Sequence, residues 1–149
     1  MELVYEYTLK TTSDPQSQLV GAGPFGTRVV ASQTGTIKGK RVNGRMVGPN
    51  ADWVLIGADG YMRLDGRGQV LTDDGAVLYA SYTGLLESSE KMQAATASGG
   101  ETQFDDQYYR LSLRLETGDK RYAWVNTTMF VGRGRRVPGG GEYEIYRVT

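Results

Sequence analysis

Residues 107–116 read Gln-Tyr-Tyr-Arg-Leu-Ser-Leu-Arg-Leu-Glu and set the pattern for the whole chain. Tyr109, Leu111, Leu113 and Leu115 fall on one face, and the other face is almost wholly polar. Successive side chains of an extended chain point to opposite faces, so a repeat of two predicts a strand between a core and a polar environment. This stretch therefore predicts β-structure, and the rest of the chain must supply its neighbours.

Similar runs recur on both sides of this stretch, separated by some of the 21 glycines. We expect further strands over residues 3–9, 27–38, 42–47, 52–56, 61–71, 76–83, 121–132 and 143–148. Asp59-Gly60 and Asp73-Asp74-Gly75 fall between such runs, and Asp-Gly pairs supply the positive φ angles that close hairpins. Residues 11–26 and 132–141 are rich in turn-forming residues, so both are predicted to be loops.

One segment departs from this rhythm. Residues 87–97 are rich in Glu, Lys, Gln and Ala, with Ser88 or Ser89 as the N-cap and Gly99-Gly100 as the stop, which predicts a single short helix. About eight or nine antiparallel strands must hide their edges, and closing the sheet does so. A closed antiparallel β-barrel is therefore predicted, with a two-sheet sandwich as the alternative. The length of 149 residues fits one domain spanning residues 1–149.

The amino-acid composition excludes several kinds of catalytic and metal-binding site. The chain has no His and no Cys, which excludes a Ser–His triad, a Cys nucleophile and thiolate or imidazole metal sites. We expect neither a cofactor nor a metal. The formal charge is zero, which disfavours nucleic acid as a partner. No basic leader and no apolar run of about 20 residues occurs, so we expect a cytoplasmic protein with no membrane contact.

Several blocks resemble one known family. They are Asn50-Ala51-Asp52-Trp53, Leu64-Asp65-Gly66-Arg67, Thr72-Asp73-Asp74-Gly75-Ala76 with Tyr79, Tyr108-Tyr109-Arg110, Glu116-Thr117-Gly118, Tyr122-Ala123-Trp124-Val125-Asn126, Phe130-Val131-Gly132 and Glu144-Ile145-Tyr146-Arg147-Val148. In this order they are similar to the domain of unknown function 3237 family, also called uncharacterised protein family 0311. The resemblance implies a small antiparallel barrel, broadly like those of lipocalins and allene oxide cyclase, and no settled activity.

Candidate site residues follow from the side chains that a barrel could turn inward. The polar faces of residues 61–71 and 107–116 point either to water or into a wet barrel interior, and periodicity alone favours water. If they point inward, the predicted catalytic residues are Asp65, Glu116, Tyr79 and Asn126, and the predicted ligand-binding residues are Arg110, Tyr122, Trp124, Trp53, Asp52 and Arg67. A carboxylate beside a cation and a buried one have different pKa values, which permits acid–base chemistry without His.

Two classes of function remain open from the sequence. In the first, the barrel binds a small, partly apolar carbonyl or aromatic compound, and Asp65 or Glu116 drives a cofactor-free lyase, isomerase or cyclase reaction. In the second, the same residues only brace a non-catalytic binding or structural module. The pattern also allows a homodimer that packs through a long strand edge or through the apolar face of Leu111, Leu113 and Leu115.

Overall fold

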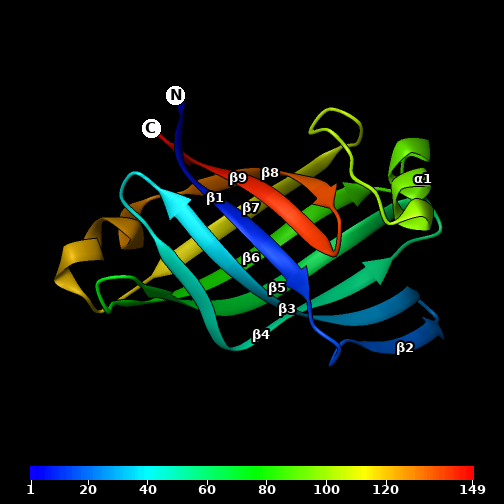
Figure 1. Ribbon diagram of the computed structural model, residues 1–149, viewed down its shortest axis with the longest axis horizontal. Helices are drawn as coiled ribbons and strands as arrows, with labels where there is room; N and C mark the ends of the chain where they lie inside the picture. The colour runs from blue at the N-terminus through cyan, green and yellow to red at the C-terminus, as the bar shows by residue number, and fades with distance from the viewer.

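The computed structural model describes residues 1–149 as one twisted sheet rolled into a barrel (Figure 1). The strands are β1 (Leu3–Ser13), β2 (Gln18–Gly23), β3 (Gly26–Gly39), β4 (Gly44–Ile56), β5 (Tyr61–Thr72), β6 (Val77–Glu87), β7 (Tyr109–Glu116), β8 (Phe130–Val137) and β9 (Gly140–Val148). The helices are α1 (Glu90–Ser98) and the 3-10 helix η1 (Lys120–Thr127).

Pairing between β1 and β3 closes the barrel. The sheet runs in the order β1-β9-β8-β7-β6-β5-β4-β3-β2, and β1 pairs antiparallel with both β9 and β3. Tyr5 lies opposite Tyr146 on one side, and Thr8 lies opposite Lys38 on the other. Eight strands thus form a closed ring, and β2 remains outside it, paired only with the first part of β3. The predicted closed barrel is confirmed, and the sandwich alternative is wrong.

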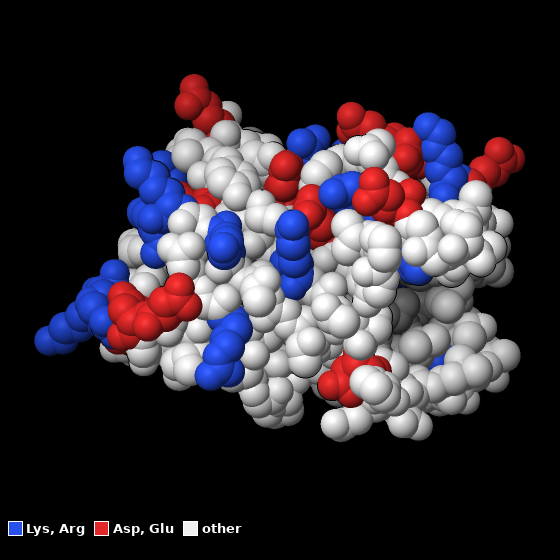
Figure 2. Space-filling model, viewed as in Figure 1, with Lys and Arg blue, Asp and Glu red and all other residues white.

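Strand β7 shows which way the alternating side chains point. Leu111, Leu113 and Leu115 are buried inside the barrel, and the polar residues between them face outward. Figure 2 shows acidic and basic side chains interspersed on one face of the molecule. Because these leucines belong to the core, they cannot form the dimer face expected from the sequence. The core cluster has 17 buried residues, which include Val42, Phe130 and, from η1, Tyr122 and Val125.

Two predicted loops are strands. Residues 11–26 contain the end of β1 and the whole of β2, which forms a hairpin with β3. Residues 132–141 contain most of β8 and the start of β9, joined by a tight turn in which Gly139 has a φ of 78°. Glycine suggested a loop there, but Gly134 serves packing, since a Cβ on it would lie 2.8 Å from the ring of Tyr109 and 2.9 Å from that of Tyr143.

The strand predicted over residues 121–132 is wrong for most of its length. Asp119 caps η1 by accepting a hydrogen bond from the Arg121 N–H at 2.9 Å, and β8 begins only at Phe130. Both faces of this stretch are apolar, so its periodicity did not distinguish a strand from a helical turn. The short strands predicted over residues 42–47 and 52–56 are parts of the single strand β4.

The predicted helix is confirmed with slightly later bounds. The Ser89 hydroxyl accepts a hydrogen bond from the Met92 N–H at 3.2 Å, and Gly99 ends α1 in the left-handed conformation with a φ of 70°. Met92 and Ala95 are its buried residues, so α1 packs on the barrel through one side (Figure 1). Neither α1 nor η1 has the length and apolar character of a membrane-spanning helix.

Candidate functional site

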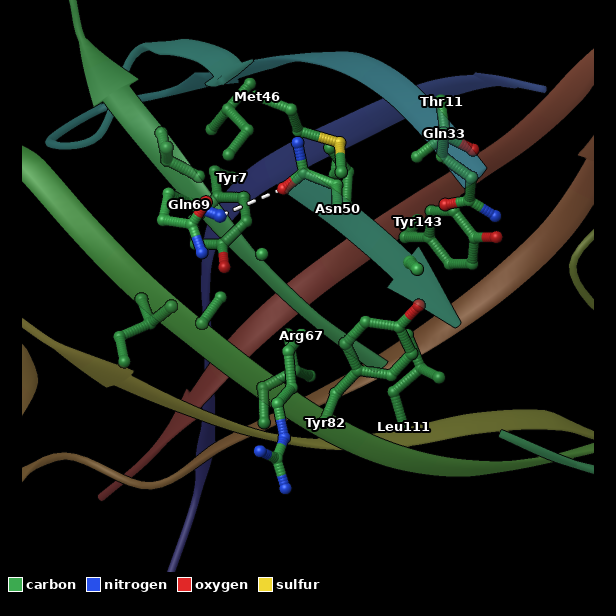
Figure 3. A pocket seen from close by; sticks show the side chains of 18 of the residues that line it. Tyr7, Thr11, Gln33, Met46, Asn50, Arg67, Gln69, Tyr82, Leu111 and Tyr143 are labelled. Carbon is green, nitrogen blue, oxygen red and sulfur yellow. Dashed lines mark hydrogen bonds between the residues drawn. The ribbon is translucent and has the colours of Figure 1, made fainter. Parts of the chain in front are cut away.

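The barrel encloses a small cavity of about 60 Å³. Pockets that bind small molecules commonly have mostly apolar walls. Most of the wall here is aliphatic or aromatic, with a few polar groups among them (Figure 3). The wall is built by residues Tyr7, Leu9, Thr11, Gln33, Ile37, Met46, Asn50, Ala51, Arg67, Gly68, Gln69, Val70, Ala80, Tyr82, Tyr109, Leu111, Leu113, Leu115 and Tyr143.

An irregular segment of β4 forms one side of this cavity. Val47 pairs with Gln69 and Ala51 with Arg67, so β4 has two residues more than β5 over this interval. The side chain of Asn50 replaces the missing main-chain bonds. Its Oδ1 accepts from the Gln69 N–H at 2.9 Å (Figure 3), and its Nδ2 donates to the carbonyl oxygens of Val47 and Gly48 at 3.1 and 2.9 Å.

Two glycines of β5 make room for inward side chains. A Cβ on Gly68 would overlap the amide oxygen of Asn50, and a Cβ on Gly66 would overlap the ring of Tyr82. Glycine inside a strand often marks such a close approach. Gly66 and Gly68 therefore fix where Asn50 and Tyr82 can lie in the barrel.

Asp52 is the buried carboxylate beside the cavity, with 4% of its surface exposed. Its Oδ2 accepts a hydrogen bond from the Tyr82 hydroxyl at 3.0 Å, and its Oδ1 accepts from the Asp65 N–H at 2.9 Å. Burial raises the pKa of Asp52 above its ordinary value, while the two hydrogen bonds oppose that rise. Burial and the nearby carboxylate of Asp52 raise the pKa of Tyr82 as well, so this phenol stays protonated at neutral pH.

Glu6 is the other buried carboxylate, and it differs from Asp52 in having cationic partners. Glu6 is held by the guanidinium groups of Arg41 and Arg147. No lysine or arginine forms an ion pair with Asp52 among the ten ion pairs of the structure (Lys10–Glu142, Arg41–Glu6, Arg63–Asp59, Lys91–Asp106, Arg121–Asp74, Arg121–Asp119, Arg133–Glu144, Arg135–Glu101, Arg135–Glu142 and Arg147–Glu6). Glu6 is therefore a structural charge, and Asp52 is a buried acid held only by neutral donors.

A second polar pair lies in the wall of the same cavity. The hydroxyls of Tyr109 and Tyr143 are 2.9 Å apart, and their rings meet edge to face at a centroid distance of 5.4 Å. Burial raises the pKa of both phenols, and the charge of Asp52 contributes to each rise. Burial raises the pKa of Tyr7 as well, so four protonated phenols line this mostly apolar cavity, and the Asp52 carboxylate lies beside it.

The predicted catalytic group does not converge. Asp65, Glu116, Tyr79 and Asn126 are all exposed, and none lines the cavity. The first three lie on the outward faces of β5, β7 and β6, because the inward face of each strand carries the apolar residues and glycines. Asn126 belongs to η1 and exchanges hydrogen bonds with the backbone of Thr117 at 2.8 and 3.0 Å. The prediction that these side chains share a cavity is wrong.

The predicted ligand-binding residues divide between the barrel and its surface. Asp52 is inside, as described above. Arg110 is outside, with its guanidinium 5.1 Å from the ring centre of Tyr108. Trp53 is exposed on the surface, and Arg67 contributes to the cavity wall while its guanidinium points away (Figure 3).

The remaining two belong to η1. Tyr122 donates to the Asp74 carboxylate at 2.9 Å, and Trp124 packs on Phe130 beneath the guanidinium of Arg41, which lies 3.6 Å from its ring centre. Sequence reasoning missed Tyr82, Tyr109 and Tyr143 as site residues. The neighbouring glycines, each marking a position where a ring needs space, were the available signal.

This architecture places the chain among closed antiparallel β-barrels with an interior cavity. Within that class, a family model described as "Protein of unknown function (DUF3237)" matches residues 1–148, and the chain belongs to this family. A UPF0311 protein of Rhodopseudomonas palustris is 27% identical over 91% of this chain and 89% of its own length.

Solved structures share the fold. The crystal structure of a conserved protein of unknown function from Rhodopseudomonas palustris aligns with a TM-score of 0.88 at 24% identity, covering 99% of this chain and 97% of the other. A protein from Acinetobacter baumannii described as β-barrel-like aligns with a TM-score of 0.83 at 26% identity, covering 99% and 96%. A structure described as an enzyme from Penicillium herquei aligns with a TM-score of 0.68 at 16% identity, covering 97% and 93%.

Proposed function

We propose that the barrel binds a small, partly apolar compound with a hydroxyl or carbonyl group, and that Asp52 and Tyr82 transfer a proton on it without a cofactor. The observation that carries this proposal is a buried carboxylate with no cationic partner, hydrogen-bonded to a half-buried phenol in the wall of a mostly apolar cavity. Perturbed acids in clefts are frequent at functional sites. An isomerisation, cyclisation or elimination fits such a pair.

Tyr82 is the group that would touch the ligand, because Tyr82 lines the cavity and Asp52 lies behind it. A ligand hydroxyl or an acidic C–H at Tyr82 gives its proton to the phenol oxygen as the phenol passes its own proton to Oδ2 of Asp52. The reverse transfer returns a proton to another ligand atom and restores both side chains. The raised pKa of Asp52 makes it a stronger base than an exposed carboxylate.

Tyr109 and Tyr143 would hold the ligand oxygen. Their shared hydrogen bond uses only one of the two hydroxyl protons, so the other proton is free to bind a carbonyl or developing enolate oxygen. The surrounding Leu111 and Leu113 side chains exclude water, which strengthens such a bond.

Binding can be tested with 2-naphthol, whose fluorescence reports both burial and loss of its proton. We expect saturable binding to the wild-type protein. We also expect Asp52→Asn and Tyr82→Phe to weaken it by about ten- to a hundredfold, as for a hydrogen bond to a charged or polarised group. Glu116→Gln, an outward-facing control, should bind like the wild type. No saturable binding, or equal binding by all four proteins, would overturn the proposal.

Proton transfer itself can be tested with 2-tetralone in deuterated water. We expect the wild-type protein and Glu116→Gln to accelerate exchange of the hydrogens next to the carbonyl, and Asp52→Asn to lose that acceleration while retaining its melting temperature. If naphthol binds normally but no exchange occurs, the barrel is a binding module, and the catalytic half of the proposal fails.

A further inference from the structure

The wall of the barrel is incomplete between β3 and β4. Ser32 pairs with Ala51 and Thr36 with Arg45, and no main-chain pairs join the two strands between these points. The interval on β4 has two residues more than the interval on β3. Since β4 also leaves β5 over Gly48–Asn50, this part of β4 bends away from both neighbours.

An outer groove lies against this gap. The groove and the interior cavity share four lining residues, Gln33, Met46, Asn50 and Ala51. One layer of side chains therefore separates the inside of the barrel from the groove. In Figure 3, Met46 and Gln33 border the cavity on the same side as Asn50. Met46 is unbranched and flexible, so it can move aside more readily than a branched or aromatic side chain.

The groove differs from the cavity in its chemistry. Its other lining includes the polar residues Asp14, Gln16, Ser32, Thr34 and Arg45 as well as Val47, Pro49 and Trp53, so its walls are more polar than those of the cavity. Arg45 is exposed and takes part in none of the ten ion pairs. Asp14, the one carboxylate in the groove, already accepts a hydrogen bond from the Gln16 N–H at 2.8 Å.

The geometry points to an elongated ligand that passes through this gap. Its apolar ring, with the reactive oxygen, lies in the cavity, and a polar tail with an anionic group lies in the groove near Arg45. This inference rests on the proposed function and extends it to a substrate class, an amphiphilic carboxylate or similar acid. A wholly apolar ligand would leave the polar groove unused.

Three fluorescent probes separate the two ideas. They are 2-naphthol, a 2-naphthol derivative with a butanoate chain on its second ring, and the same derivative as the uncharged butanamide. We expect the butanoate to bind wild-type protein about three- to tenfold more tightly than the butanamide, because an ion pair with the exposed Arg45 adds modestly to affinity in water. Added salt should reduce that advantage.

Arg45→Gln should bring butanoate binding down to that of the butanamide, while 2-naphthol binding stays unchanged. Arg114→Gln, an exposed substitution on β7, is the matched control and should keep the full advantage. If 2-naphthol binds but the butanoate has no advantage, or keeps it in Arg45→Gln, the groove inference is overturned and the proposed function stands. If 2-naphthol itself does not bind, both are overturned.

Discussion

Replacing Gly68 by alanine tests whether β4 and β5 are joined through the side chain of Asn50. A Cβ at position 68 would overlap the Asn50 amide oxygen and lie 3.0 Å from its Cγ. The φ of Gly68 lies outside the left-handed region, so the backbone itself accepts alanine. The new methyl group must therefore displace the Asn50 side chain and break its three hydrogen bonds.

The cost can be worked from those bonds. Displacing Asn50 leaves the Gln69 N–H and two carbonyl oxygens without their partner. An unpaired buried polar group costs about 1–3 kcal/mol, and part of this set can reach water, so we expect Gly68→Ala to lower the free energy of unfolding by about 2–4 kcal/mol. Asn50→Ala breaks the same bonds and should cost about the same. For a chain of this size, 1 kcal/mol corresponds to roughly 2–4 °C in melting temperature.

The double variant gives the sharper result. Because each change destroys the same interaction, Gly68→Ala with Asn50→Ala should cost about 2–4 kcal/mol, not twice that, in a double-mutant cycle measured by urea unfolding. Gly118→Ala is the control, since a Cβ there would meet nothing within 4 Å. Costs that add to within about 0.5 kcal/mol would show that Asn50 and Gly68 do not compete for one space, and would refute the reasoning.

Three further outcomes follow from buried polar groups. The raised pKa of Asp52 means that its carboxyl group holds a proton more tightly in the folded protein than in the unfolded chain, so the contribution of Asp52 to stability falls as pH rises above about 3.9. Asp52→Asn should remove that fall in urea titrations at several pH values, and an unchanged pH profile of stability would contradict this reasoning. Tyr143→Phe leaves the hydroxyl of its tyrosine partner unpaired and should cost about 1–2 kcal/mol in the same assay, whereas no cost would mean that the pair is not formed. Arg41→Met leaves Glu6 with Arg147 alone and should cost about 1–3 kcal/mol with little dependence on salt; a loss that high salt abolishes would place Glu6 in water.

The alternation of buried and exposed residues along the strands could be predicted from the sequence, but the side chains that line the cavity could not. The alternation of residues 107–116 correctly predicted a strand with one buried face, and the turn at Asp59-Gly60 correctly separated two strands. Asp65 was predicted to be catalytic because charged groups in a barrel could face inward. In β5 the residues that face inward are instead Leu64, Gly66 and Gly68. Because glycine has no side chain, the two glycines did not indicate which face of the strand is buried.

The candidate site depends on the irregular pairing of β4 with β5, which the hydrophobic periodicity of the sequence does not indicate. Two extra residues in β4 set the register of Asn50 and Asp52 against β5, and this register brings Asp52 to Tyr82. Asp52 was predicted only as a ligand contact, and nothing in the sequence indicated that its neighbour would be a tyrosine 30 residues later. The signal that was present lay in Gly66 and Gly68, because glycine within a strand marks a close approach.

Closure of the barrel through β1 affects how the chain folds. Tyr5 meets Tyr146 across almost the full length of the polypeptide, a contact of very high sequence separation that slows folding. During synthesis β1 can pair with β3 long before β9 leaves the ribosome, so β1 and β8 both expose unpaired edges until the last strand arrives. The nascent protein therefore passes through an open sheet prone to aggregation, and the mature ring is its protection.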